Sequence, residues 1–144
     1  MSLRPLAFVA MAVLFIHSAR ATPPPPVAVV EIDYLLQHVE ASGCDFYRNG
    51  SWYDGAHAKA HLRMKYDYLV ARNQIGSAED FIDKAASKSS FSGQPYKIRC
   101  EGASAVESNP WLRDALEHSS ACLVGVPGDA SVCMANSNSA STGA

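Results

Sequence analysis

Gly43-Cys-Asp-Phe-Tyr-Arg-Asn-Gly-Ser-Trp-Tyr-Asp54 is the stretch that decides the fold of this chain. Asn49 and Gly50 both tolerate a positive φ, so they predict a two-residue type I′ turn between aromatic-rich flanks. The turn also predicts which side chains face one another across the hairpin. The opposed pairs are Arg48 and Ser51, Tyr47 and Trp52, Phe46 and Tyr53, and Asp45 and Asp54.

A hairpin alone is only marginally stable in water, so a third strand or a helix has to cover it. We expect the third strand at Tyr96-Lys-Ile-Arg-Cys100, antiparallel to the first strand. The opposed pairs are then Cys44 and Cys100, Asp45 and Arg99, Phe46 and Ile98, Tyr47 and Lys97, and Arg48 and Tyr96. Apolar residues meet apolar ones and an acid meets a base, whereas a one-residue slip would reverse every face. The predicted sheet therefore has three antiparallel strands in the order second, first, third.

The first 21 residues have the pattern of a signal peptide. A short basic start precedes an apolar run from Leu6 to Ile16, and Ala19-Arg-Ala21 resembles a cleavage site. The run is too short to span a membrane. Cleavage would remove Arg4 and Arg20, which lowers the basic residues from 12 to 10 against 14 acidic ones and gives a net charge of −4. We expect a periplasmic or secreted protein without a membrane span in the mature chain and without a nucleic-acid partner.

The chain has 4 cysteines, all of which follow the predicted cleavage site. Disulfides persist in an oxidising compartment, and four cysteines allow three pairings. The strand register favours a bond between Cys44 and Cys100, which leaves Cys122 to pair with Cys133.

The mature chain divides by composition into three parts. Residues 22–28 form a proline-rich spacer, residues 29–121 a single domain, and residues 122–144 a low-complexity tail that we expect to be mostly disordered. Apolar periodicity and capping residues predict about four helices in the domain. They are expected at 27–42, at 55–72 after the cap Asp54, at 78–88 after the cap Ser77, and from the cap Asn109 onward. The fold class is therefore α+β, with the helices on the Phe46/Ile98 face of the sheet.

Four short motifs occur in an order that is seen in one bacterial family. They are Phe46-x-Arg-Asn-Gly50, His61-Leu-Arg-x-Lys65, Ala78-Glu-x-Phe-Ile82 and Ser89-Ser-x-Ser-Gly-x-Pro-Tyr96. Over roughly residues 32–117 the chain is similar to the YfeK-like family of small secreted bacterial proteins of unknown function. The resemblance implies a periplasmic protein and supplies neither catalytic residues nor a cofactor.

The sheet face opposite Phe46 is the first candidate for a recognition surface. Tyr47, Trp52, Lys97 and Arg99 would lie there, and aromatic and cationic side chains are typical anchors of interfaces. We therefore favour a non-catalytic binding or interaction module, with a periplasmic protein or an anionic glycan as its partner. The candidate binding residues from this face and from the motifs are Tyr47, Arg48, Trp52, His61, Arg63, Lys65, Ser92, Gly93, Tyr96 and Lys97.

Two alternatives use the serine-rich segment 89–96. Ser92-Gly-Gln-Pro-Tyr96 resembles the Ser-Gly-x-x-Tyr loop of some periplasmic lysozyme inhibitors, although those proteins are largely β-sheet. A hydrolase would instead use His61 as base, Glu79 as its orienting acid and one of three serines, Ser89, Ser90 or Ser92, as nucleophile. None of these serines lies in a nucleophile elbow.

A metal site is the last candidate. His57 and His61 are four residues apart on the expected second helix, which suits Zn²⁺ or Cu²⁺ only if a third ligand is near. Asp54 is the one nearby candidate, so we expect no metal site and no cofactor.

Overall fold

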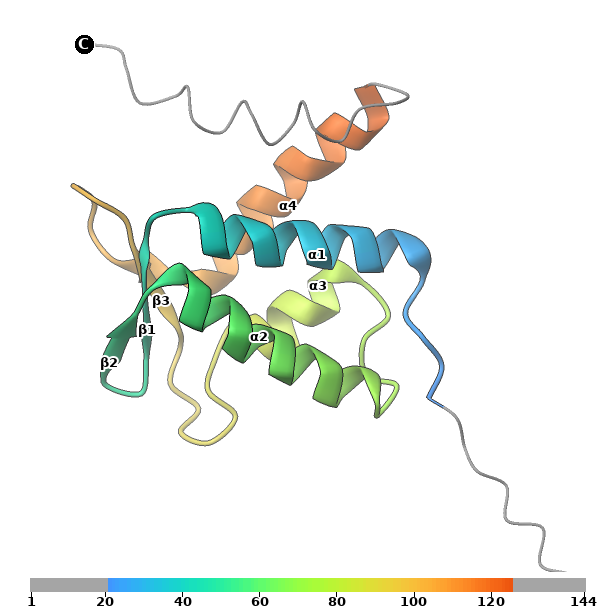
Figure 1. Cartoon of the computed structure of the whole chain (residues 1–144), viewed down its shortest axis with the longest axis horizontal. Coiled ribbons are helices and arrows are strands. Elements are labelled where there is room, and N and C mark those ends of the chain that lie inside the picture. The colour runs from blue at the N-terminus through green and yellow to red at the C-terminus, as the bar shows by residue number, and fades with distance from the viewer. Residues whose placement is uncertain (1–20, 126–144) are drawn as a thin grey trace, which may run out of the picture.

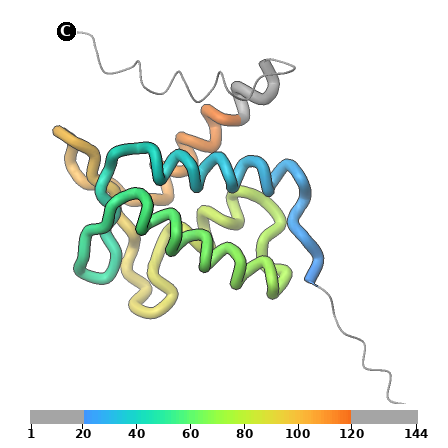
Figure 2. Tube along the Cα trace, in the orientation of Figure 1, coloured from blue at the N-terminus to red at the C-terminus, as the bar shows by residue number. Residues whose placement is uncertain are grey.

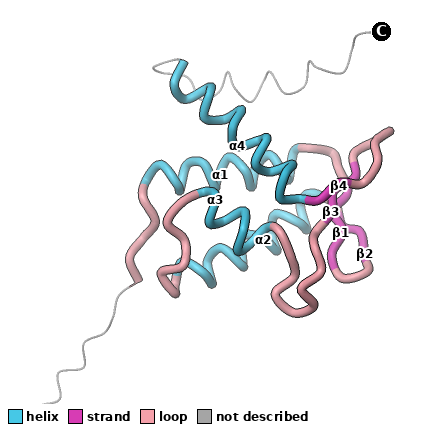
Figure 3. The backbone as a smooth tube through the Cα atoms, turned by 180° about the vertical axis from the view of Figure 1, so that it is seen from behind, coloured by secondary structure: helices cyan, strands magenta, loops and turns pink. Residues whose placement is uncertain are grey.

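The computed structural model describes residues 21–125, with side chains through residue 119. A layer of helices is closed at one end by a small antiparallel sheet (Figure 1). Seen from behind, the short strands gather at the same end of the molecule (Figure 3). The α+β class is therefore confirmed.

The sheet has four strands rather than three, in the order β2-β1-β3-β4. They are β1 (Asp45–Arg48), β2 (Ser51–Tyr53), β3 (Lys97–Arg99) and β4 (Val106–Glu107). The prediction of three strands was wrong because β4 has only 2 residues, too few for an alternating pattern to stand out in the sequence. β4 lies on the outer edge of β3, where Glu107 pairs with Lys97 and Val106 with Ile98.

The predicted register of the first three strands is confirmed. Phe46 lies opposite Tyr53 on one side and opposite Ile98 on the other. Asn49 and Gly50 have φ values of 48° and 93°, as a type I′ turn requires. Asp54 lies just beyond the ladder and caps the following helix instead of pairing with Asp45.

A disulfide joins Cys44 to Cys100 at one end of the paired strands β1 and β3. The two cysteines are 56 residues apart in the sequence, and their Cα atoms are 4.2 Å apart. The bond predicted from the register is therefore confirmed. The second predicted bond involves Cys133, which lies outside the described residues.

Helices α1 (Pro26–Ala41) and α2 (Gly55–Val70) pack along each other and extend away from the sheet (Figure 1). The first turn of α2 approaches the last turn of α1 so closely that a Cβ on Gly55 would lie 2.5 Å from the Val39 carbonyl oxygen. Only glycine fits this position without a backbone shift. The Asp54 side chain caps α2 by accepting a hydrogen bond of 2.8 Å from the backbone N–H of His57.

The predicted third helix is two elements, the α-helical turn α3 (Ala78–Phe81) and the π-helix η1 (Ile82–Ala86). Ser77 caps α3 as expected, by accepting from the Asp80 N–H at 3.2 Å. At the far end the Ser87 hydroxyl donates to the Ile82 carbonyl oxygen at 2.6 Å. The backbone hydrogen bonds of a π-helix join residues five apart, a spacing that apolar periodicity in the sequence does not reveal.

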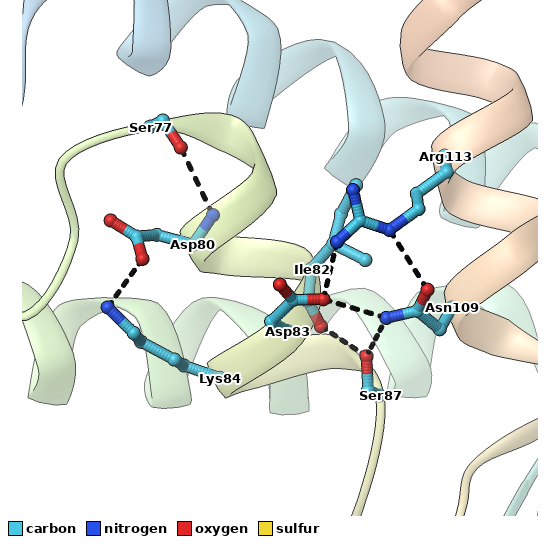
Figure 4. Close-up of polar contacts among 8 residues, drawn as sticks. All are labelled: Ser77, Asp80, Ile82, Asp83, Lys84, Ser87, Asn109 and Arg113. Atoms are coloured by element: carbon cyan, nitrogen blue, oxygen red, sulfur yellow. Dashed lines mark hydrogen bonds and ion pairs between the residues drawn. The ribbon is translucent and has the colours of Figure 1, made fainter.

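A polar network fastens the π-helix to the last helix, α4 (Ser108–Gly125), as Figure 4 shows. Asp83 accepts from Arg113 at 2.7 Å and from Asn109 at 2.9 Å, and Asn109 also donates to Ser87 at 2.7 Å. Asn109 therefore lies inside α4 and joins two elements, whereas the sequence predicted it as the cap. The helix begins one residue earlier, directly after β4, since Ser108 is held by the Tyr96 and Ala86 carbonyls.

The core lies where the helices meet the inner face of the sheet. Its fully buried large side chains are Ile32, Leu35, Leu36, Val39, Phe81, Ile82, Ile98 and Leu112. α4 continues to Gly125, past the predicted domain end at residue 121. Residues 1–20 of the predicted signal peptide and residues 126–144 of the predicted tail lie outside the described residues.

Candidate functional site

The outer face of the sheet, defined here by Asp45, Tyr47, Trp52, Lys97 and Arg99, points away from the helices. All of these side chains are exposed except Tyr47, which is half-buried, and Trp52 retains 37% of its surface. The Tyr47 and Trp52 rings are 5.2 Å apart, and the Arg99 guanidinium lies 4.1 Å from the centre of the Trp52 ring. The pairing that the sequence predicted for this face has thus produced a solvent-accessible aromatic surface.

Charges on the outer face are balanced by neighbouring acids. Arg99 forms an ion pair of 3.0 Å with Asp45, and Lys97 is directly opposite Glu107 in the strand register. Exposed pairs of this kind contribute little to stability, but they do cancel the local field. The outer face is therefore amphipathic rather than strongly basic.

The inner face of the sheet borders a cavity of about 110 Å³. Its walls are mostly apolar and come from α1, α2, α4 and the sheet; they include Val39, Phe46, Leu62, Ile98 and Leu112. Polar side chains from β1, β2, α2 and the segment before β3 also line it, namely Arg48, Tyr53, His57, His61 and Tyr96. An apolar pocket with a few convergent polar groups is the usual form of a small-molecule site.

Three basic residues, Arg48, His61 and Lys65, form what we call the basic cluster beside this cavity. His61 Nε2 lies 3.1 Å from the Tyr96 hydroxyl, and Lys65 Nζ lies 3.5 Å from the same oxygen. Lys65 also donates to the Lys88 carbonyl at 2.9 Å, which holds its ammonium group in place. Arg48 enters from β1, with its guanidinium 4.9 Å from the centre of the Tyr53 ring.

Burial and mutual repulsion disfavour positive charge in the basic cluster. Burial, reinforced by Arg48 and Lys65, lowers the pKa of His61 to about 4. Burial and Arg48 lower the pKa of Lys65 to about 8. Burial also raises the pKa of Tyr96, so its hydroxyl stays protonated at neutral pH. At pH 7 the cluster consists of a cationic arginine, a mostly cationic lysine and a neutral histidine.

The structure divides the ten candidate residues into four groups. Tyr47, Trp52 and Lys97 lie on the outer face, whereas Arg48, His61, Lys65 and Tyr96 meet beside the cavity. Ser92 and Gly93 lie on the exposed loop before β3, which projects beside the hairpin (Figure 2). Arg63 lies apart from the others in an ion pair of 2.7 Å with Asp33 of α1.

The loop 89–96 is held by its own hydrogen bonds. The Ser89 hydroxyl is buried and accepts from the backbone N–H groups of Phe91 and Ser92, both at 3.3 Å. The Ser92 hydroxyl donates to the Asn49 side chain at 2.7 Å, which joins the loop to the hairpin turn. Tyr96 is only 8% exposed and points inward, whereas Phe91 at the loop tip is 97% exposed. The Ser-Gly-x-x-Tyr segment thus presents its serine and glycine to solvent but not its tyrosine.

The residues of the hydrolase alternative and of the metal-site candidate do not converge among the described side chains. His61 bonds to Tyr96 rather than to Ser89, Ser90 or Ser92. Glu79 acts electrostatically on Glu31 of α1, whose pKa is raised by burial and by that repulsion. His57 is paired with Asp54 at 2.8 Å, and the side chains described through residue 119 include no group of three or more His, Cys, Asp or Glu arranged to hold a metal ion.

Residues 26–120 match a family described as "Family of unknown function (DUF5329)". The chain belongs to this family. It is also 49% identical over 51 residues to "Uncharacterized protein YfeK" of Salmonella typhimurium (strain LT2). That alignment covers 35% of this chain and 41% of the relative, so the chain spans less than half of the relative's length. The resemblance to a YfeK-like family of unknown function is confirmed.

No solved structure matches the chain. The family match includes every residue of the outer face, the cavity walls and the basic cluster. Within the described part of the chain, no helix has the length and apolar character needed to cross a membrane.

Sequence reasoning did not anticipate the cavity or the part that Tyr53 and His57 have in lining it. One signal was available for Tyr53, because alternation along the hairpin places it on the same face as Arg48 and Phe46. The cavity itself depends on how the helices pack, which the sequence pattern does not specify.

Proposed function

We propose that the protein is an exported, non-catalytic binding module that holds a protein partner through the outer face of its sheet. The Tyr47–Trp52–Arg99 stack carries the proposal, since it places aromatic and cationic groups together on an accessible surface. Tyrosine, tryptophan and arginine are the residues that most often dominate interface energetics.

The charge balance of the outer face favours a protein over an anionic glycan. A polyanion would have to displace Asp45 from Arg99, and it would face Glu107 beside Lys97. A protein surface can complement paired charges of both signs around an aromatic centre.

A periplasmic or secreted location is part of the proposal. Two observations support it: the signal-peptide pattern of the first 21 residues and the disulfide between Cys44 and Cys100. Disulfides of this structural kind are typical of oxidising compartments. The YfeK-like resemblance is consistent with the same location.

Site-specific cross-linking in living bacteria tests the outer face. A photo-reactive amino acid in place of Tyr47 should cross-link one discrete partner, and Trp52→Ala in the same chain should reduce that adduct at least about tenfold, as loss of an interface hot spot does. The matched control is Tyr68 on α2, which is 56% exposed and stacks at 3.5 Å on Arg72. The same photo-reactive group at position 68 should give no such adduct.

The proposal is wrong if positions 47 and 68 give the same adducts, or if Trp52→Ala leaves the adduct unchanged. A glycan partner would show itself as an adduct that resists protease and is lost after glycosidase treatment. Melting temperatures of the variants must be compared alongside, so that a loss of folding is not mistaken for a loss of recognition.

A further inference from the structure

The cavity on the inner face has the size and lining of a binding site for a small apolar group. Its volume of about 110 Å³ is comparable with the ~150 Å³ cavity that binds benzene in a well-studied engineered protein core. Phe46, Leu62 and Ile98, all buried, contribute to its walls. A ring or a short branched chain fits this space, whereas a long acyl chain does not.

Among the described side chains, no acid forms an ion pair with the basic cluster beside the cavity. Arg48 and Lys65 are the charged groups that act on His61, and both are cationic. Two acids belong to α2 and its cap, and both have other partners: Asp54 is occupied by His57 and by the N–H groups of the first helical turn, and Asp67 pairs with Arg63 at 3.8 Å. A buried or half-buried set of cations without an acid favours the binding of an anion.

Hydrogen-bond donors converge at the same place. The Tyr96 hydroxyl lies 3.1 Å from His61 Nε2 and 3.5 Å from Lys65 Nζ, and Arg48, which lines the same cavity, carries a guanidinium with a planar set of donors. Guanidinium and ammonium groups both bind carboxylate and phosphate oxygens. The donors come from three separate segments, so the fold is what assembles them.

We propose that this cavity binds a small aromatic or branched-chain anion, with its apolar group between Phe46, Leu62 and Ile98 and its carboxylate or phosphate at Arg48, His61 and Lys65. The site is distinct from the outer face, and its ligand is independent of the protein partner proposed above. With this site, the protein has two binding surfaces, one for a protein partner and one for a small anion.

Calorimetry with three matched probes tests both halves of the ligand. Phenylacetate carries ring and charge, phenylacetamide carries the ring without the charge, and acetate carries the charge without the ring. Phenylacetate should bind one-to-one with a dissociation constant of about a millimolar or tighter, as expected for about ten non-hydrogen atoms. Phenylacetamide and acetate should each bind at least about tenfold more weakly, since each forfeits one set of contacts.

Two variants and one control assign the site. Arg48→Gln should weaken phenylacetate at least about tenfold by removing a cation, and Ala58→Phe should block the cavity, which Ala58 lines. Arg63→Gln removes a cation of α2 that pairs with Asp33 and Asp67 away from the cavity, and it should leave binding unchanged. Phenyl phosphate, as a fourth probe, shows whether a carboxylate or a phosphate fits better.

A spectroscopic readout separates the proposed contact from a structural effect. The His61 imidazole, followed by NMR, should titrate near its pKa of about 4 in the free protein and at higher pH with phenylacetate bound, because a nearby anion favours the protonated ring. Affinity should fall as the pH rises past about 8, where Lys65 loses its proton.

Three results would overturn the proposal. Equal affinity for phenylacetate and phenylacetamide would show that the cavity has no anion site. Equal affinity for phenylacetate and acetate would show that the anion binds weakly outside the cavity. A loss in Arg63→Gln as large as the loss in Arg48→Gln would show a general charge effect. The cross-linking at position 47 is unaffected by any of these outcomes, so the two proposals fail separately.

Discussion

The two faces of the sheet carry similar residue types but differ in how their charges are matched. On the outer face, Arg99 stacks on Trp52 and pairs with Asp45 at 3.0 Å. On the inner face, Arg48 and Lys65 lie near Tyr96 and His61 without an acid. The outer face is therefore a neutral aromatic surface, and the inner face is a shielded, positively charged site beside an apolar cavity.

Covering by helices explains the contrast. Water solvates the outer face, so the pairing of its ions contributes little to stability. Burial on the inner face makes the same kind of cation costly, which lowers the pKa of Lys65 to about 8 and that of His61 to about 4. The composition of a strand therefore does not reveal its chemistry until the covered side is known.

The largest expected effect concerns the bond that both faces share. Replacing Cys44 and Cys100 together with alanine should lower the free energy of unfolding by about 4 kcal/mol, because the bond closes a loop of 56 residues in the unfolded chain. Urea denaturation of the double variant and of the reduced native protein measures the loss, which should be the same in both. A change below about 1 kcal/mol would show that the paired strands are stable without the bond.

The next prediction separates the faces by packing. Phe46→Ala should cost about 3 kcal/mol, near the low end for a phenylalanine truncation because the ring already borders a cavity. Trp52→Ala, one strand away on the outer face, should cost about 1 kcal/mol or less, because that ring is 37% exposed. Thermal or urea unfolding of the pair is the measurement. Equal losses would mean that the outer face is part of the core and would also weaken the recognition proposal.

The smallest effect is a pH dependence that only the inner face should show. His61 has a pKa near 4 in the folded protein and near 6.5 when unfolded, so the unfolded state binds more protons between these values. Stability due to this residue is therefore complete above pH 6.5 and is lost as the pH falls toward 4. In that pH window, His61→Gln should reduce the slope of unfolding free energy against pH, by at most the amount that corresponds to the uptake of one proton on unfolding. Arg63→Gln, the control, should leave the slope as it is in the native protein.

Much of the sheet could be predicted because strand pairing repeats a simple rule. Asn49 and Gly50 define the turn, and alternation from that turn assigns each side chain to a face. The same register brought Cys44 opposite Cys100. β4 was missed because two residues are too few to show an alternating pattern, and the π-helix was missed because it is defined by backbone hydrogen bonds between residues five apart, which side-chain periodicity does not indicate.

The candidate site was predicted only in part. Tyr47, Trp52 and Lys97 were assigned to one face from alternation alone. Arg48, His61, Lys65 and Tyr96 were named individually from motifs, but nothing in the sequence placed them at one cavity. These four side chains come together only if α2 is correctly positioned against the inner face of the sheet. The close contact of Gly55 with the end of α1 helps to determine that position.

The sequence by itself determined the hairpin, the strand register, the Cys44–Cys100 bond and the sidedness of each strand residue, because all of these follow from local backbone preferences and a period of two. Only the tertiary structure decided how large the cavity is and which charged side chains meet beside it. These properties depend on the packing of helices that are distant in the sequence, and packing is a sum over many side chains rather than a local rule.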